Sequence, residues 1–124
     1  MIDANGTALP GYHPVPRTKI NVGVPFYGMG NAGGIREWNR TYRYSFYYQD
    51  ENFDPHLNYA NESYYNGPTT IRDKTAYALL HGKVGGIMIW ALTHDVTYDA
   101  RYSLLKTIRT TIDMFSYLKS TTLP

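Results

Sequence analysis

The chain of 124 residues is long enough for one domain with a hydrophobic core, but too short for a complete (β/α)8 barrel of about 250 residues. Its 12 basic and 10 acidic residues give a net charge of +2, which indicates neither nucleic acid nor a membrane surface as a partner. The absence of cysteine excludes disulfide bonds and thiol catalysis, and no apolar stretch approaches the length of about 20 residues that spans a bilayer.

The chain is rich in aromatic residues, with 13 Tyr, 4 Phe and 2 Trp. A tyrosine ring combines a flat apolar face with a hydroxyl group, which suits sugars because their faces carry C–H groups and their edges carry hydroxyls. The same rings also serve protein contacts and hydrophobic cores. The composition therefore favours a recognition function without identifying its target.

The first part of the chain predicts an irregular lead-in followed by one strand. Residues 1–16 are rich in Gly and Pro and have little periodicity. Apolar residues then alternate at Ile20, Val22 and Val24, which predicts a strand over 19–27. The glycine-rich segment 29–34 has the spacing of neither a dinucleotide-binding loop nor a phosphate-binding loop, and we expect a turn there.

Residues 29–68 form an aromatic-rich insertion before the next regular element. The segment 43–48 predicts a strand, because Tyr and Phe fit a pleated and half-buried surface, but its partner is not evident. A connection of this length in a compact domain is usually functional or carries small elements of its own.

Two helices and a buried strand complete the chain. The first helix is expected over 70–81, capped by Thr70 and ended by Gly82 in a left-handed conformation. The run 86–92 is continuously apolar, which is typical of a strand buried on both faces of a parallel sheet. An apolar stripe predicts the second helix over 102–117. The resulting strand, helix, strand, helix order indicates an α/β fold.

Trp90 stands near the end of the apolar strand. In parallel sheets ligands are bound at the carboxyl ends of the strands, so this ring could form the floor of a binding site. Buried aromatic residues more often serve packing, and the residues alone leave both interpretations open.

Three segments resemble the family 18 glycoside hydrolases, which are chitinase-like (β/α)8 barrels. Residues 19–28 resemble their seventh strand, and 64–74 resemble the end of their insertion and the start of helix seven. Residues 85–90 with Asp95 and 103–105 resemble their eighth strand and last helix. The resemblance implies that 1–124 is a C-terminal fragment of such a barrel, an α/β fold with its last two strand–helix units, strands seven and eight, and an insertion.

The same resemblance implies a sugar-binding function. Trp90 would be the floor under the sugar beside the scissile bond, Tyr27 a wall and hydrogen-bond donor, and Trp38 part of the rim. The ligand would be chitin or an N-acetylglucosamine oligosaccharide, and a secreted or periplasmic location is suggested although no signal peptide is evident. We expect no cofactor and no metal, since His94 has no second ligand at a suitable spacing.

The catalytic signature of the family, Asp-x-x-Asp-x-Asp-x-Glu, does not occur in the chain. The Glu of that signature protonates the glycosidic oxygen, so we assign no catalytic residue and expect the chain alone to be inactive. Asp95 and Asp99 flank a predicted helix start, where capping is the simpler role. Met29 and Ala91 stand where many members place a sugar-contacting Arg and a Glu.

The sequence is also compatible with two other functions. The chain could be a non-catalytic carbohydrate-binding module of the same ancestry, or a structural fragment that associates with itself. Two strands taken from a barrel leave open edges, which pair with further strands. The expected protein partner is accordingly the missing N-terminal part of the barrel or another copy of the chain.

Overall fold

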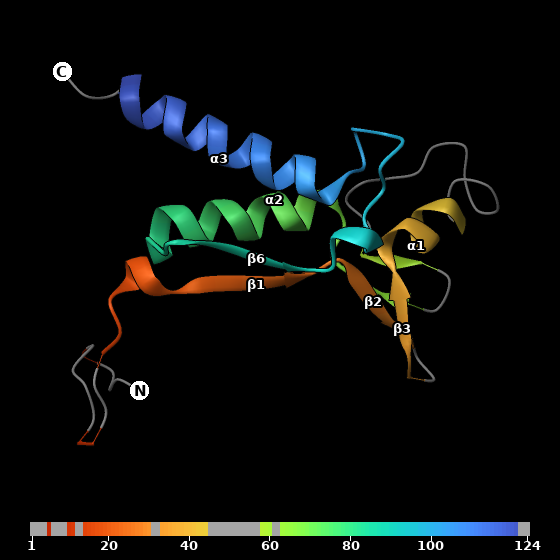
Figure 1. Ribbon diagram of the computed structural model, residues 1–124, viewed down its shortest axis with the longest axis horizontal. Helices are drawn as coiled ribbons and strands as arrows, with labels where there is room; N and C mark the ends of the chain where they lie inside the picture. The colour runs from red at the N-terminus through yellow and green to blue at the C-terminus, as the bar shows by residue number, and fades with distance from the viewer. Residues whose placement is uncertain are drawn as a thin grey trace.

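The computed structural model describes residues 5, 10–11, 14–30, 33–44, 58–60 and 63–121. Two small sheets and three α-helices make up this part of the chain (Figure 1). The lead-in and the centre of the insertion lie mostly outside the described residues. Within the described part, no helix combines the length and the apolar character that crossing a membrane requires.

The first sheet is a parallel pair of strands, β1 (Asn21–Pro25) and β6 (Gly86–Trp90). Asn21 is opposite Gly86 and Pro25 is opposite Trp90, so the two strands end at the same level. The observed strand β1 is shorter than the predicted strand 19–27, because a 3₁₀ turn (Arg17–Lys19) precedes it. At its other end Tyr27 begins the second sheet.

Two helices cover one face of the parallel pair (Figure 1). Helix α2 (Pro68–Tyr77) runs into a π-helical turn (Ala78–Gly82) that leads to β6, and α3 (Leu104–Thr121) packs along α2. This order confirms the expected α/β class. The described strands do not form a closed barrel.

The predicted ends of the first helix need correction. The helix begins at Pro68, which favours the first helical position because it has no N–H to leave unpaired, and its N-cap is Gly67. Thr70 therefore lies inside the first turn, where its hydroxyl donates a hydrogen bond to Asn58 Oδ1 (2.9 Å). At the other end Lys83, with φ of 50°, takes the left-handed position that we expected for Gly82.

The second sheet is antiparallel, with the strand order β3-β2-β5-β4. Its strands are β2 (Tyr27–Gly30), β3 (Ile35–Glu37), β4 (Tyr59–Ala60) and β5 (Ser63–Tyr64). The predicted turn over 29–34 is thus partly wrong, because β2 continues to Gly30 and the reversal is made later. Gly33 and Gly34 allow it with φ values of 85° and 90°, which side chains rarely tolerate.

Helix α1 (Trp38–Tyr44) follows β3 directly. The predicted strand over 43–48 is wrong where it can be assessed, because Arg43 and Tyr44 are the last residues of α1 and the rest lies outside the described residues. Tyrosine and phenylalanine favour strands only when a sheet neighbour is present, and here Arg43 and Tyr44 belong to a helix.

The hydrophobic core joins the two sheets to the helices. Its buried members are Val24, Phe26, Trp38, Tyr42, Tyr65, Ile71, Val96, Leu104 and Ile108. Ile87 and Ile89 pack against this core from β6, whereas Met88 and Trp90 on the other face are 53% and 65% exposed. The expectation that 86–92 is buried on both faces is therefore wrong for this chain, because the described helices cover one face only.

Candidate functional site

Trp90 lies at the carboxyl end of the parallel pair with its side chain largely exposed. Its backbone oxygen accepts a hydrogen bond from Phe26 N (2.7 Å), which ties the end of β6 to the residue that follows β1. The peptide bond between Trp90 and Ala91 is cis. The hydrogen bond from Phe26 holds the backbone of Trp90 while the side chain remains 65% exposed, an arrangement that can bind a flat ligand.

Tyr27 stands beside this strand end as the first residue of β2. Its ring meets the edge of His94, with the ring centroids 6.2 Å apart and the planes at 85°. His94 belongs to a short 3₁₀ turn (Leu92–His94) that follows β6, and its amide donates to Ala91 O (2.9 Å). The segments that follow β1 and β6 therefore bring Tyr27 and His94 together near Trp90.

Trp38 does not form a rim. Its side chain is 1% exposed, and its indole Nε1–H donates a hydrogen bond to Tyr102 O (2.7 Å). Its ring packs against those of Tyr65 and Tyr42, at centroid distances of 5.2 and 6.2 Å. The rim position predicted from the sequence is wrong, because as the first residue of α1 Trp38 points into the core.

Two polar residues of this region, Glu37 and Asn39, carry no obvious sequence signal. Glu37 is the register partner of Tyr27, and its carboxylate lies 3.6 Å from the guanidinium of Arg40. Asn39 donates a hydrogen bond to Thr93 O (3.0 Å), which joins α1 to the turn after β6. Glu37 Oε2 and His94 Nδ1 are shielded from solvent and have no hydrogen-bond partner within the described residues. Only the register of the β2–β3 hairpin brings Glu37 opposite Tyr27, so its position could not be inferred from spacing.

Asp99 is held by two hydrogen-bonded neighbours. The guanidinium of Arg101 donates to both carboxylate oxygens (3.1 and 3.0 Å), and Tyr42 Oη donates to Oδ2 (3.0 Å). The hydrogen bonds from Arg101 lower the pKa of Asp99 to about 2, and burial together with Asp99 raises the pKa of Tyr42 above its usual range. Asp99 is therefore ionised at neutral pH and cannot act as a general acid.

Asp95 binds the free amides at the start of helix α3. It accepts hydrogen bonds from the amides of Leu104 (2.7 Å) and Leu105 (3.0 Å), which are the first residues of α3, and from Ser103 Oγ (2.8 Å). Capping of the last helix, the simpler role expected for this carboxylate, is thus observed. No group of three or more possible metal ligands lies together among the described residues.

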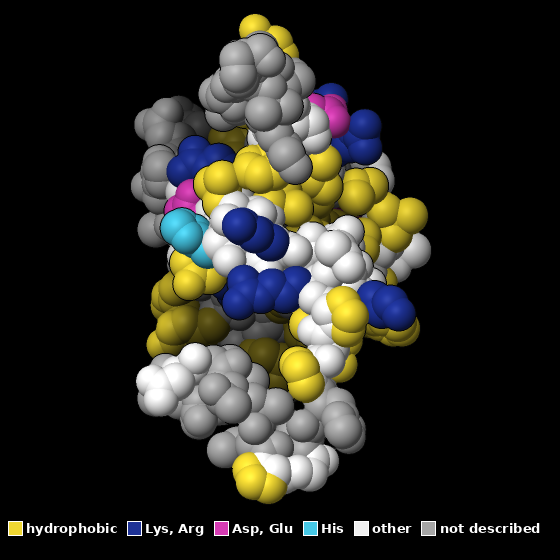
Figure 2. All heavy atoms as spheres, turned by 90° about the vertical axis from the view of Figure 1, so that its left-hand side faces the viewer, with side chains coloured by type: hydrophobic (Ala, Val, Ile, Leu, Met, Phe, Trp, Pro, Cys, Tyr) yellow, Lys and Arg dark blue, Asp and Glu magenta, His cyan; other side chains and the backbone are white. Residues whose placement is uncertain are grey.

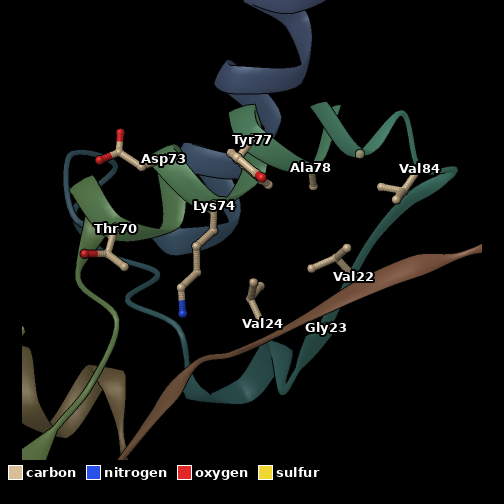
Figure 3. Close-up of a pocket in the computed structure, with 10 residues that line it drawn as sticks. Val22, Gly23, Val24, Thr70, Asp73, Lys74, Tyr77, Ala78 and Val84 are labelled. Carbon is tan, nitrogen blue, oxygen red and sulfur yellow. The ribbon is translucent and has the colours of Figure 1, made fainter. Parts of the chain in front are cut away.

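A hollow of about 610 Å³ lies between β1 and α2, apart from Trp90 (Figure 3). Val22 and Val24 of β1 line one side, and Lys74 extends from α2 over the opening toward the strand. In the described part of the chain β1 pairs only with β6, so one edge of β1 has no partner strand. The hollow thus lies beside a strand with an unpaired edge. On the side that is at the left of Figure 1, Lys and Arg side chains lie beside hydrophobic ones (Figure 2).

The chain resembles solved chitinase structures. Its sequence matches no protein-family model and no curated protein. The GH18 chitinase ChiB from the chitin utilization locus of Flavobacterium johnsoniae superposes on 78% of the chain, with 31% sequence identity and a TM-score of 0.63. A chitinase from Bacteroides thetaiotaomicron matches the fold over 77% of the chain, with 24% identity and a TM-score of 0.59.

These matches cover only part of each chitinase. The chain spans 29% of the first structure and 32% of the second. The resemblance predicted from the sequence is nevertheless confirmed, since both matches extend over most of the chain. The chain is a mixed α/β protein similar to part of the family 18 chitinases.

Proposed function

We propose that this chain forms the last two strand–helix units of a family 18 barrel and contributes a sugar-binding wall to a chitin-directed hydrolase. The observation that carries the proposal is the exposed ring of Trp90 at the carboxyl end of a parallel strand. Ligands of α/β barrels are bound at that end of the strands. The similarity to chitinase structures supports a chitin-type ligand, which we take to be chitin or an N-acetylglucosamine oligosaccharide.

The architecture supports a place in a larger barrel. A parallel sheet is normally buried on both faces and has more than two strands, because its crossover connections place helices over it. Here β1 and β6 have helices on one face, and each strand has one partner among the described residues. The hollow beside β1 and the exposed side chain of Met88 on β6 are surfaces that further strand–helix units would cover.

The proposed site binds and orients a sugar rather than cleaving it. The Trp90 ring would lie under the C–H face of one pyranose, and Tyr27 would flank it with its ring and hydroxyl group. Glu37, the register partner of Tyr27, and His94, whose ring meets that of Tyr27, are polar residues beside this flank. The catalytic acid is assigned to the part of the barrel that this chain does not contain.

Replacement of Trp90 tests the proposal. Its ring exposes 65% of an area of about 250 Å², and a sugar on one face would cover roughly 80 Å². At about 25 cal/mol per Å² this contact is worth about 2 kcal/mol, or roughly thirtyfold in affinity. We therefore expect Trp90→Ala to weaken binding of N-acetylglucosamine hexasaccharide about thirtyfold by titration calorimetry, with the thermal midpoint nearly unchanged.

Tyr117→Ala is the matched control, because Tyr117 is similarly exposed (64%) but lies on α3. It should bind the hexasaccharide like the wild type. Equal binding by Trp90→Ala and the wild type, or an unfolded Trp90→Ala protein, would contradict the proposed site. The chain alone should also show no turnover of chitin oligosaccharides above buffer, since acid catalysis alone contributes roughly 10² to 10⁴ in rate.

Self-association is a second candidate function, and the open edges of β1 and β6 favour it. A strand edge presents unpaired N–H and C=O groups that pair with a further strand, including one from another copy. Sedimentation velocity at micromolar concentration shows whether the chain associates with itself or stays monomeric. A concentration-dependent dimer supports this candidate, and a monomer that unfolds cooperatively rejects it.

A further inference from the structure

A chain of hydrogen bonds joins the start of α1 to the carboxyl ends of the parallel pair. The backbone N–H of Trp38 donates to Phe26 O (2.8 Å), and the backbone N–H of Phe26 donates in turn to Trp90 O (2.7 Å). The indole of Trp38 is also bonded, because its Nε1–H donates to Tyr102 O (2.7 Å). The first residue of α1 is therefore held in one network with the backbone of Trp90.

Asn39, the second residue of α1, makes a contact on the other side of Trp90. Its Nδ2–H donates a hydrogen bond to Thr93 O (3.0 Å) in the turn Leu92–His94, which lies beside the start of α1 (Figure 1). Within the described part of the chain, no other side chain donates to a carbonyl of this turn. Packing holds the turn only weakly, because Leu92 is 58% exposed and Thr93 is exposed as well.

This turn carries one ring of the proposed site and follows another. His94 is its last residue, and the ring of His94 packs edge-on against that of Tyr27, with the centroids 6.2 Å apart. Trp90 precedes the turn by two residues, and because its side chain is 65% exposed, few contacts of the ring itself fix its orientation. The placement of both rings thus depends on the backbone, which Phe26 holds at Trp90 and Asn39 holds in the turn.

Helix capping does not explain the contact of Asn39. A helix-capping side chain uses its oxygen to accept a hydrogen bond from a backbone N–H of the first turn. The Asn39 side chain instead donates through Nδ2, to a residue 54 positions away in the sequence. The bond therefore fixes the insertion against the strand end rather than stabilising the start of α1.

We propose that Asn39 is a positioning residue of the strand-end site, which holds the turn Leu92–His94 and thereby keeps the rings of Trp90 and His94 in one arrangement before the ligand arrives. The inference rests on the proposed function for its ligand class. Asn39 acts through the turn and is assigned no contact with the sugar. A preorganised site binds more tightly, because less free energy is lost in ordering the protein when the ligand binds.

Relaxation of ¹⁵N nuclei tests the geometric part of the inference without sugar. The His94 amide, which donates to Ala91 O, should have an order parameter of about 0.85 in the wild type and below about 0.6 in Asn39→Ala. The indole N–H of Trp38 is the internal control, since it donates to Tyr102 O and should stay rigid in both proteins. Arg43→Ala, an exposed change on the same helix, should alter neither signal.

Titration calorimetry with N-acetylglucosamine hexasaccharide tests the functional part. Asn39→Ala should bind about fivefold more weakly than the wild type, which is the effect of one neutral hydrogen bond. Asn39→Asp keeps the shape of the side chain but has no N–H to donate, so it should show the same loss, and it covers the case in which Asn39→Ala fails to fold. Arg43→Ala should bind like the wild type. All titrations are made below the thermal midpoint of each variant, so that the folded protein is compared.

The outcomes separate this inference from the proposed function. An unchanged order parameter of His94, or an unchanged affinity despite a loosened turn, overturns the role of Asn39, and the site at Trp90 stands if Trp90→Ala still weakens binding. Loss of order at both His94 and the Trp38 indole assigns Asn39 to the stability of α1 and likewise overturns the inference. If the wild type does not bind the hexasaccharide, the proposed function and this inference both fail.

Discussion

The capping of α3 by Asp95 should account for a large part of the stability of this chain. Asp95 is 5% exposed and accepts hydrogen bonds from the amides of Val96, Leu104 and Leu105 and from Ser103 Oγ. Two of these amides start α3, where no carbonyl of the helix can reach them. Asp95→Ala removes both oxygens and leaves the amides of Val96 and Leu104 buried without an acceptor.

The expected loss follows from these contacts. Each buried donor left unpaired costs about 1 to 3 kcal/mol, and Asp95→Ala leaves two of them. Partial relaxation of the helix end and entry of water reduce the sum, so we expect Asp95→Ala to lower the free energy of unfolding by about 4 kcal/mol. Asp95→Asn keeps one acceptor oxygen and should lose about 1 to 2 kcal/mol.

Urea denaturation followed by far-ultraviolet circular dichroism measures these differences. Asp113→Ala is the control, because Asp113 makes an exposed ion pair with Arg109 in the same helix (3.1 Å), which is worth about 0.3 to 0.5 kcal/mol. A loss below about 1 kcal/mol for Asp95→Ala, or equal losses for both variants, would refute the reasoning.

Three further predictions concern other parts of the structure. Trp38→Ala should cost about 3 to 5 kcal/mol in denaturant unfolding because its ring is fully buried, and a near-neutral effect would contradict that burial. Because the folded pKa of Asp99 is lowered to about 2, its contribution to stability is complete above its ordinary pKa of 3.8 and is lost as the pH falls toward 2. In an NMR titration Arg101→Met should move the midpoint of Asp99 up toward 3.8, and an unchanged midpoint would exclude Arg101 as the main cause. Gly28→Ala should destabilise the antiparallel sheet by about 1 to 3 kcal/mol in thermal unfolding, because the added atom meets Tyr64 O at 2.6 Å; an unchanged midpoint would show that β2 and β5 separate at little cost.

Regular elements with a clear period were predictable from the sequence. The alternation at Val22 and Val24 indicated β1, and the apolar stripe of the last helix indicated α3, because each pattern reflects the face that packs on the core. The strand β6 was also predicted, but not that one of its faces is exposed. A continuous apolar run does not tell which face of a strand is covered, and in this chain Met88 on one face of β6 is 53% exposed.

The insertion was the least predictable part. Trp38 and Tyr42 are core residues, yet an aromatic residue in an irregular segment carries no signal that separates burial from exposure. The antiparallel sheet depends on three strand registers, which cannot be inferred from sequence spacing. Trp90 could be placed at a strand end because both the apolar run and the family resemblance pointed there.

The two tryptophans of the chain offer the most direct test of the proposed sugar-binding site. In a proton–nitrogen correlation spectrum each indole gives one Nε1–H signal, assigned with Trp90→Phe and Trp38→Phe. Titration with N-acetylglucosamine hexasaccharide should shift the signal of the exposed Trp90 and leave that of Trp38, which donates to Tyr102 O, in place. If the Trp90 signal stays unchanged at saturating sugar, Trp90 does not form the floor of a sugar-binding site.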